Sequence, residues 1–217
     1  AENLERLGKS CFSYCPQLNS IRCELAAEKF SCLEKSKQCD CVVCNSEVEA
    51  SLKRGQIEEQ NSVVQLDLES IDDALRRFDI NITTQQALDA EEGQIINGCL
   101  ILQEQQYNPE AFQKRTDFTS VTALRLKRLP HFMFYQAENL NTVIMPEVTG
   151  MSEHQKINSA FVGTKVFNCY FPKLVRVGSF AFYSCPIQTL DNQNFPALRI
   201  VGQGGFQQSQ VRSINLP

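Results

Sequence analysis

The chain has 217 residues, of which 42% are hydrophobic and 21% charged, with a formal net charge of -4. This is the composition of a folded globular protein and excludes wholesale disorder. The acidic balance argues against nucleic-acid binding, and no apolar run approaches the ~20 residues that a transmembrane helix needs.

The first segment, residues 1–21, carries a spaced apolar pattern that returns near the end of the chain. The residues that carry it are Leu4, Leu7, Gly8, Phe12, Cys15, Leu18 and Ile21. The pattern is already under way at the first residues and shows no polar cap. We therefore expect residues 1–21 to be the end of a first repeat array in a longer protein.

Five cysteines are concentrated in the segment that follows. They are Cys23, Cys32, Cys39, Cys41 and Cys44. In an oxidising compartment this density is typical of a disulfide-stapled cap or linker, although the pairing does not follow from sequence. Two alternatives stay open, namely free thiols and a zinc site. Zinc ligation is disfavoured because Cys39 and Cys41 stand only two residues apart.

Three short helices are predicted after the cysteines. The first spans residues 45–55, the second spans residues 70–78, and the third follows Thr84 and ends at Gly93. Together with the cysteine cluster they define residues 22–93 as a Cys-rich, partly helical module between repeats.

The next stretch leads into a second array. Residues 95–102, IINGCLIL, are predicted as one buried strand in which Gly98 marks a bend or bulge. Residues 104–117 are polar and are predicted as a loop or short helix. We assign residues 94–217 to a repeat array that continues beyond the chain.

The strongest signal is a repeat with a period of 24 residues near the C-terminus. FPKLVRVGSFAFYSCPIQTL (171–190) and FPALRIVGQGGFQQSQVRSI (195–214) align without a gap. The matching pairs are Phe171/Phe195, Pro172/Pro196, Leu174/Leu198, Val177/Val201, Gly178/Gly202, Phe182/Phe206, Ile187/Val211 and Leu190/Ile214. The frame also appears at residues 126–143, and a degenerate copy around Phe161 is slipped by three residues.

The spacing predicts stacked coils. Short strands turn the Leu, Val and Ile side chains inward, and glycines permit the turn that follows. The Phe of each copy fills the space between successive coils. One coil buries about five large apolar side chains at ~1.5–3 kcal/mol each, which does not offset the conformational entropy of ~24 residues at ~1–2 kcal/mol each. Only a stack of coils is therefore stable.

The frame L-x-x-[LV]-G-x-x-x-F-x-x-C, followed by L-x-x-I-x-L-P, resembles the leucine-rich repeat of the BspA-like type. Residues 171–217 carry the resemblance best, followed by residues 126–146 and residues 4–21. It implies an α/β fold, a curved leucine-rich-repeat solenoid of short parallel strands. Members of this family often stand on the surfaces of bacteria and single-celled eukaryotes, with adhesive or host-binding roles.

The outward positions of the predicted strands form the expected partner-binding face. They are Ser20, Arg22, Thr142, Ile144, Thr189, Asp191, Ser213 and Asn215. Their small polar side chains favour a modest or broad interface over a few deep hot spots.

The cysteines inside the repeats are expected to be core residues. Cys15 and Cys185 share one repeat position, three residues after the core Phe. Cys11, Cys99 and Cys169 also lie among apolar residues. A buried thiol at such a position acts as a small apolar side chain.

No catalytic motif is found, so we expect neither an enzyme nor a cofactor. His131 and His154 stand outside any known signature. Asp72-Asp73 and Glu91-Glu92 are interpreted as solvated or helix-end charges. An enzyme that uses zinc in the cysteine cluster is the remaining catalytic alternative.

The sequence therefore predicts a non-catalytic, protein-binding solenoid of a secreted or cell-surface protein. Its partner would be another protein or a surface glycoconjugate. Asn81-Ile82-Thr83 is a glycosylation sequon, which would mark Asn81 as an exposed site in a secreted chain. The alternative is an intracellular, cytoplasmic scaffold repeat with reduced cysteines.

Overall fold

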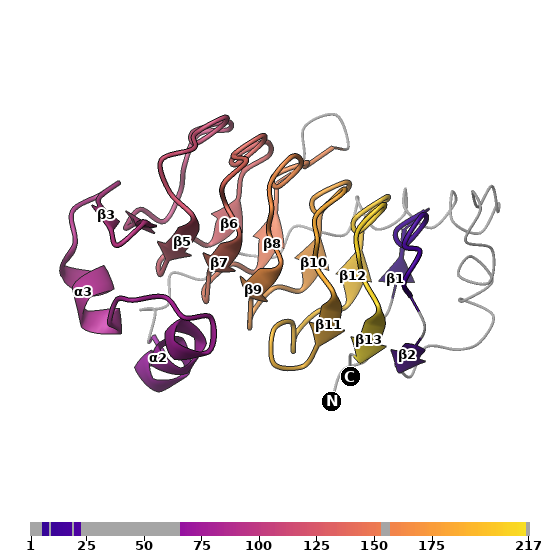
Figure 1. Ribbon diagram of the computed structural model, residues 1–217, viewed down its shortest axis with the longest axis horizontal. Coiled ribbons are helices and arrows are strands. Elements are labelled where there is room, and N and C mark those ends of the chain that lie inside the picture. Colours follow the sequence, from indigo (N-terminus) through magenta and orange to yellow (C-terminus); the bar gives the residue numbers. More distant parts are fainter. Residues whose placement is uncertain (1–5, 9, 19, 23–65, 153–156, 216–217) are drawn as a thin grey trace.

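The chain winds into a solenoid with two rows of short strands (Figure 1). The structure, a computed structural model, describes residues 6–8, 10–18, 20–22, 66–152 and 157–215. Each coil runs through a front strand, a short corner, a back strand, and a wide turn that returns the chain to the front. The predicted leucine-rich-repeat solenoid of parallel strands is confirmed.

The front row is parallel throughout except for its first strand. Its members are β3 (Ile95–Ile96), β4 (Cys99–Leu102), β5 (Ser120–Ala123), β7 (Thr142–Ile144), β9 (Asn168–Tyr170), β11 (Thr189–Asp191), β13 (Ser213–Asn215) and β2 (Ser20–Arg22). Thr189 pairs with Ser213, 24 residues on, as the repeat predicts. Elsewhere, Cys99 pairs with Ser120, Ser120 with Thr142 and Thr142 with Asn168, which gives offsets of 21, 22 and 26 residues.

The back row consists of two-residue strands that also run parallel. They are β6 (Arg128–Leu129), β8 (Gly150–Met151), β10 (Arg176–Val177), β12 (Ile200–Val201) and β1 (Arg6–Leu7). Apolar side chains from both rows meet in one core, to which Leu174 and Leu198 contribute as expected.

A continuous stack of phenylalanines fills the wide turns. Its members, in order, are Phe112, Phe134, Phe161, Phe182, Phe206 and Phe12. The ring centroids of neighbours lie 4.8–5.7 Å apart, and the planes of Phe182 and Phe206 differ by only 2°. The predicted role of the repeat Phe between coils is confirmed.

Phe112 shows that the prediction for residues 104–117 was wrong. This stretch forms a wide turn of the solenoid, with Phe112 stacked on Phe134 at 5.6 Å. Its other positions are polar or charged, so only the Phe preserves the repeat pattern.

Two residues in each wide turn adopt a left-handed backbone, one two residues before the core Phe and one two residues after it. They are Ser10, Tyr14, Glu110, Lys114, Phe132, Gln136, Ser159, Gly163, Phe180, Ser184, Gly204 and Gln208. Most are not glycine, and this conformation costs ~1–2 kcal/mol per residue. Hydrogen bonds to the next coil offset the cost: the amides of Phe132 and Phe134 donate to the carbonyls of Asn158 and Ala160 at 2.8 and 3.0 Å.

The N-terminal coil stacks on the C-terminal one. β1 pairs with β12, and β2 pairs with β13, so residues 6–22 extend the same stack as residues 94–217. The proposed division into two arrays did not anticipate this contact. The division at residues 21 and 93 stays a prediction, because residues 23–65 lie outside the described part of the chain.

Gly8 offers a test of this closure. A Cβ at Gly8 would lie 2.5 Å from the backbone of Gly202, so Gly8→Ala is expected to weaken the contact by roughly 1–3 kcal/mol. The amides of Phe206 and Gln208 donate to the carbonyls of Cys11 and Ser13, both at 2.9 Å. Hydrogen exchange should show these two amides losing protection.

The matched control for this substitution is Gly150→Ala. A Cβ at Gly150 meets no atom within 4 Å, so the exchange rates should not change. Unaltered protection of Phe206 and Gln208 in Gly8→Ala would contradict the closure.

The segment at residues 95–102 is a hairpin instead of the predicted single strand. β3 and β4 pair antiparallel, with Ile96 opposite Cys99. Asn97 and Gly98 have φ values of 50° and 79°, as a two-residue hairpin turn requires. The hairpin covers the first edge of the front sheet.

Two helices follow the predicted positions. α2 (Leu68–Arg77) confirms the helix expected at residues 70–78, and α3 (Thr84–Asp89) begins as predicted. α3 ends before Gly93 because Ala90 is already extended, with ψ of 151°. The helix expected at residues 45–55 lies outside the described residues. No helix in the described part is long and apolar enough to cross a membrane.

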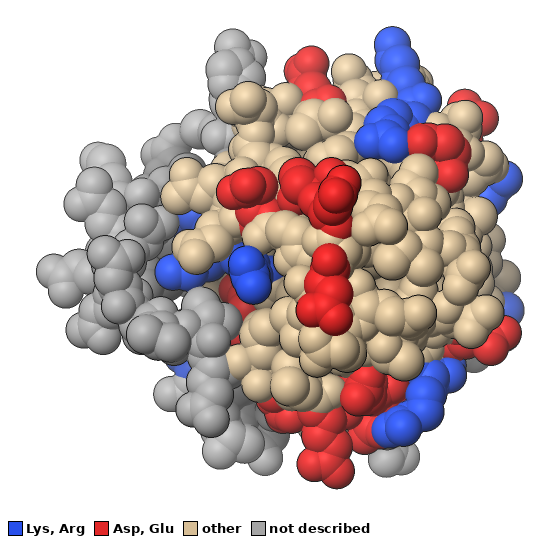
Figure 2. All heavy atoms as spheres, turned by 90° about the vertical axis from the view of Figure 1, so that its left-hand side faces the viewer, with Lys and Arg blue, Asp and Glu red and all other residues tan. Residues whose placement is uncertain are grey.

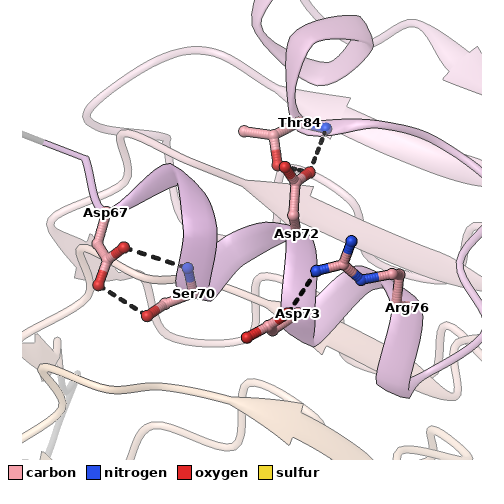
Figure 3. A network of polar contacts seen from close by, with 6 residues as sticks. All are labelled: Asp67, Ser70, Asp72, Asp73, Arg76 and Thr84. Carbon is pink, nitrogen blue, oxygen red and sulfur yellow. Dashed lines mark hydrogen bonds and ion pairs between the residues drawn. The ribbon is translucent and has the colours of Figure 1, made fainter.

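Polar contacts fix both helix starts (Figure 3). Asp67 accepts from the amide and hydroxyl of Ser70, and the amide of Thr84 donates to Asp72 at 3.1 Å. These hydrogen bonds hold the pKa values of Asp67 and Asp72 below their usual range. Asp73 pairs with Arg76 on the exposed face of α2.

Candidate functional site

The expected partner-binding face is half covered by the helices. α2 and α3 pack through Ile71, Leu75 and Ala87 against the outward side of β4, β5, β7 and β9. The outward side chains beneath them include Ile101, Ile144 and Tyr170, which are apolar or aromatic. This forms a second core, separate from the one inside the solenoid.

Two of the predicted partner-binding residues are therefore not available. Thr142 and Ile144 are 2% and 0% exposed. Their assignment to a binding face was wrong, because the sequence pattern could not show that helices from another segment cover these strands.

The uncovered part of this face lies on β11, β13 and β2. Thr189 and Asn215 are exposed, whereas Ser213 and Asp191 are half-buried. Asp191 accepts from the amides of Gln193 and Asn194, both at 3.0 Å, so its carboxylate stabilises a local turn. Ser20 and Arg22 lie in register with Ser213 and Asn215, and their side chains are outside the described set.

Arg77 at the end of α2 marks the border between the covered and open parts. Its guanidinium donates to Asn194 Oδ1 at 2.8 Å and to Gln193 Oε1 at 3.1 Å. It also lies over the ring of Tyr170. The open strip is consequently narrow.

A second surface runs along the wide turns, at the top of Figure 1. Here aromatic side chains that are not part of the phenylalanine stack reach solvent. We name as the turn ridge the set Tyr14, Phe132, Tyr135, Phe180 and Tyr183. Tyr14 is 49% exposed, and the other four are half-buried.

The ridge contains two equivalent aromatic pairs. Phe132 meets Tyr135 edge-to-face at 5.6 Å, and Phe180 meets Tyr183 in the same manner at 6.3 Å. Edge-to-face pairs hold ring orientation and favour it by ~0.5–1.5 kcal/mol. A side-chain carbon at Gly204 would overlap the ring of Phe180, so this ring lies against the next coil.

Aromatic and small coils alternate along the ridge. The coil between the two aromatic pairs places Ser159, Val162 and Gly163 at the corresponding positions. The coil after Phe180 has Gly204, Gln207 and Gln208, and Tyr14 follows in the next. Aromatic side chains thus recur at every second coil.

The ridge carries no charge. From Phe132 to Gln208, and in the N-terminal coil, none of the residues two before, one after or two after the core Phe is acidic or basic. Enrichment in aromatic residues together with depletion of charge is the compositional mark of a protein interface core.

A sequence signal for the ridge was present but not recognised. The motif F-x-F-Y occurs at residues 132–135 and again at residues 180–183, 48 residues later. Its central Phe belongs to the core, which drew attention away from the flanking aromatics.

The end of the solenoid capped by α2, α3 and the hairpin is acidic (Figure 2). Residues 67–104 hold nine Asp or Glu residues and two Arg residues. Some of these charges have structural roles: Glu92 accepts from the hydroxyl of Tyr107 at 2.8 Å and from the amide of Gln103. Burial is the main cause of the raised pKa of Tyr107.

The repeat cysteines lie in the core, as predicted. Cys15 and Cys185 donate to the carbonyls of Phe206 and Phe161, each at 3.2 Å. Cys11, Cys99 and Cys169 are also buried. The clustered Cys23, Cys32, Cys39, Cys41 and Cys44 lie outside the described residues, so their disulfides stay a prediction.

The buried thiols are expected to resist alkylation in the folded protein. Desolvation raises the pKa of Cys185 to about 12 and raises the pKa of Cys99 and Cys169. Because the thiolate is the nucleophile, little of it exists at pH 8. Peptide mass mapping after iodoacetamide should find these three sites modified only in denaturant. Equal modification with and without denaturant would contradict their burial.

The remaining candidates have structural surroundings. His131 lies edge-on to Phe132 at 5.7 Å, while His154 is outside the described residues. Within the described ranges, no group of three or more His, Cys, Asp and Glu side chains is placed to hold a metal ion.

Asn81 stands in an exposed loop before α3. Its carbonyl accepts from Asn97 at 2.8 Å, and Thr83 of the same sequon caps α3. Glycosylation of Asn81 stays a prediction.

Stacked coils, parallel strands and the phenylalanine stack together define a leucine-rich-repeat solenoid. A family model described as the BspA type leucine-rich repeat region matches in six copies, over residues 1–51 and 105–217. The chain belongs to this family. Comparison with curated proteins and with solved structures gave no match.

Proposed function

We propose that this chain is a non-catalytic protein-binding domain of a secreted or cell-surface protein, used in adhesion or recognition, and that the turn ridge is its contact surface. The uncharged, aromatic composition of the ridge is the observation that carries the proposal. A row of rings fixed by edge-to-face contacts loses little side-chain entropy on binding.

The narrow open strip of β11 and β13 is the second candidate surface. It offers Thr189 and Asn215, but one of its neighbours, Asp191, is held in an intramolecular turn. Small polar residues contribute less to binding than buried aromatic anchors. We therefore place the strip at the margin of the interface.

Binding can be tested with the immobilised domain on a panel of extracellular proteins and on glycans. We expect saturable protein binding that falls at least tenfold in Tyr135→Ala/Tyr183→Ala. The matched control, Thr189→Ala/Asn215→Ala, should bind as the unaltered chain does. Loss of binding only in the control would move the interface to the strand face, and selective glycan binding would contradict a protein partner.

Location outside the cell is tested through the clustered cysteines. Intact mass after alkylation, with and without reductant, reports whether Cys23, Cys32, Cys39, Cys41 and Cys44 are oxidised. Disulfides support the extracellular proposal. Five reduced thiols in protein from its natural source would instead support an intracellular scaffold, and bound zinc would support a zinc module.

A further inference from the structure

We propose that the turn ridge binds an uncharged, proline-rich segment in polyproline II conformation, with the prolines of a P-x-x-P motif on successive aromatic coils. This inference rests on the proposed function and names the chemistry of the partner. It begins from the two-coil alternation of rings along the ridge.

The first argument is the spacing of the aromatic pairs. Phe134, Phe161 and Phe182 mark three successive coils, with ring separations of 5.7 and 4.8 Å. The pairs at Phe132 and Phe180 flank the first and third of these coils, so they lie about two strand spacings apart, or ~9.6 Å. A polyproline II helix advances ~3.1 Å per residue and repeats every three residues, or ~9.3 Å.

The spacing separates this partner from an extended strand. A strand presents side chains to one face every ~6.7 Å, which falls between the aromatic coils. A third aromatic, Tyr14, follows the Phe180 coil by another two coils, so the register extends over a third repeat of the ligand.

The second argument concerns hydrogen bonds. A polyproline II segment has no internal hydrogen bonds, so its carbonyls need donors. The ridge supplies the hydroxyls of Tyr135 and Tyr183 and the exposed amide of Gln136. An α-helix satisfies its own carbonyls and would leave these donors without a role.

The third argument is charge. The ridge positions from Phe132 to Gln208 are all uncharged. A charged segment would lose hydration on this surface without gaining an ion pair. Ring faces and neutral donors are the two features that proline-recognition surfaces combine.

The test uses fluorescently labelled peptides and the folded chain. The probes are decaproline, a glycine-serine peptide of the same length, and a helical (EAAAK)-repeat peptide. Anisotropy titration is expected to give decaproline at least tenfold tighter binding than either other peptide. Equal binding of the glycine-serine peptide, or tighter binding of the helical one, would overturn the proposal.

Two variants locate the site. Tyr135→Ala/Tyr183→Ala should weaken decaproline binding at least tenfold, while Thr189→Ala/Asn215→Ala should leave it unchanged. Tyr135→Phe/Tyr183→Phe keeps the rings and should cause a smaller, two- to fivefold loss. A thermal melt verifies folding of each variant, and unchanged binding in a folded Ala variant would overturn the site.

The two proposals fail in different ways. If a protein partner binds the ridge and the ridge variant abolishes it, but decaproline does not bind, only the proline inference is wrong. If neither decaproline nor any protein on the panel responds to the ridge variant, the ridge is not the interface.

Discussion

Replacement of Phe182 by alanine is expected to lower the free energy of unfolding by about 3–5 kcal/mol. Phe182 lies between Phe161 and Phe206, with ring separations of 4.8 and 5.2 Å, and is fully buried. The coils on both sides would border the cavity, because each coil of a solenoid depends on its neighbours. Chemical denaturation should show a much lower midpoint.

Phe180→Ala is the matched control for this result. Phe180 is two residues away, in the same turn, but it belongs to the half-buried ridge. We expect a loss of no more than about 1.5 kcal/mol. Similar losses for both variants would contradict a special role of the stack in stability.

Replacement of Ile144 by aspartate is expected to cost roughly 3–5 kcal/mol and to detach α2 from the front sheet. Ile144 is fully buried beneath the helices, beside Leu75 and Tyr170 in the second core. An aspartate there would be a buried charge without a partner. Circular dichroism and limited proteolysis of residues 66–90 should report the detachment.

The solenoid itself provides the control for Ile144→Asp. Asn215 occupies the corresponding last position of β13 and is exposed. Asn215→Asp should therefore change stability by no more than about 0.5 kcal/mol. Equal effects at the two positions would show that the helices do not cover the sheet.

The core of the fold could be predicted because it repeats. Phe182 and Phe206 occupy equivalent positions in the sequence and in space, and Cys15 and Cys185 share one environment. A 24-residue spacing is visible wherever inward positions are apolar. Phe112 escaped notice because it is the one apolar residue that its coil retains at a conserved spacing of rings.

The binding face was harder to predict because outward positions follow no shared rule. Ile144 and Asp191 have equivalent places on their strands, yet one is covered and the other borders solvent. The difference depends on where α2 packs, which is a long-range property. Only the identity of the residues hinted at it, since the outward side chains change from Ile144 and Tyr170 to Asp191 and Asn215.

The wide turns could not be derived from residue preference. Phe132 and Phe180 have φ values of 55° and 57°, in a region that glycine and asparagine normally occupy. Hydrogen bonds between coils impose this conformation. A reading of local propensity would have placed these two aromatics in strands.

The contact between the first and last coils has a consequence for the order of assembly. Most coils meet a neighbour about two dozen residues away, whereas the thiol of Cys15 reaches a carbonyl 191 positions further along. Contacts of such long range form late, since the loss of chain entropy precedes the gain. On a ribosome, the segment synthesised first would wait for the segment synthesised last, and during this interval it would be the part of the molecule most open to proteases and chaperones.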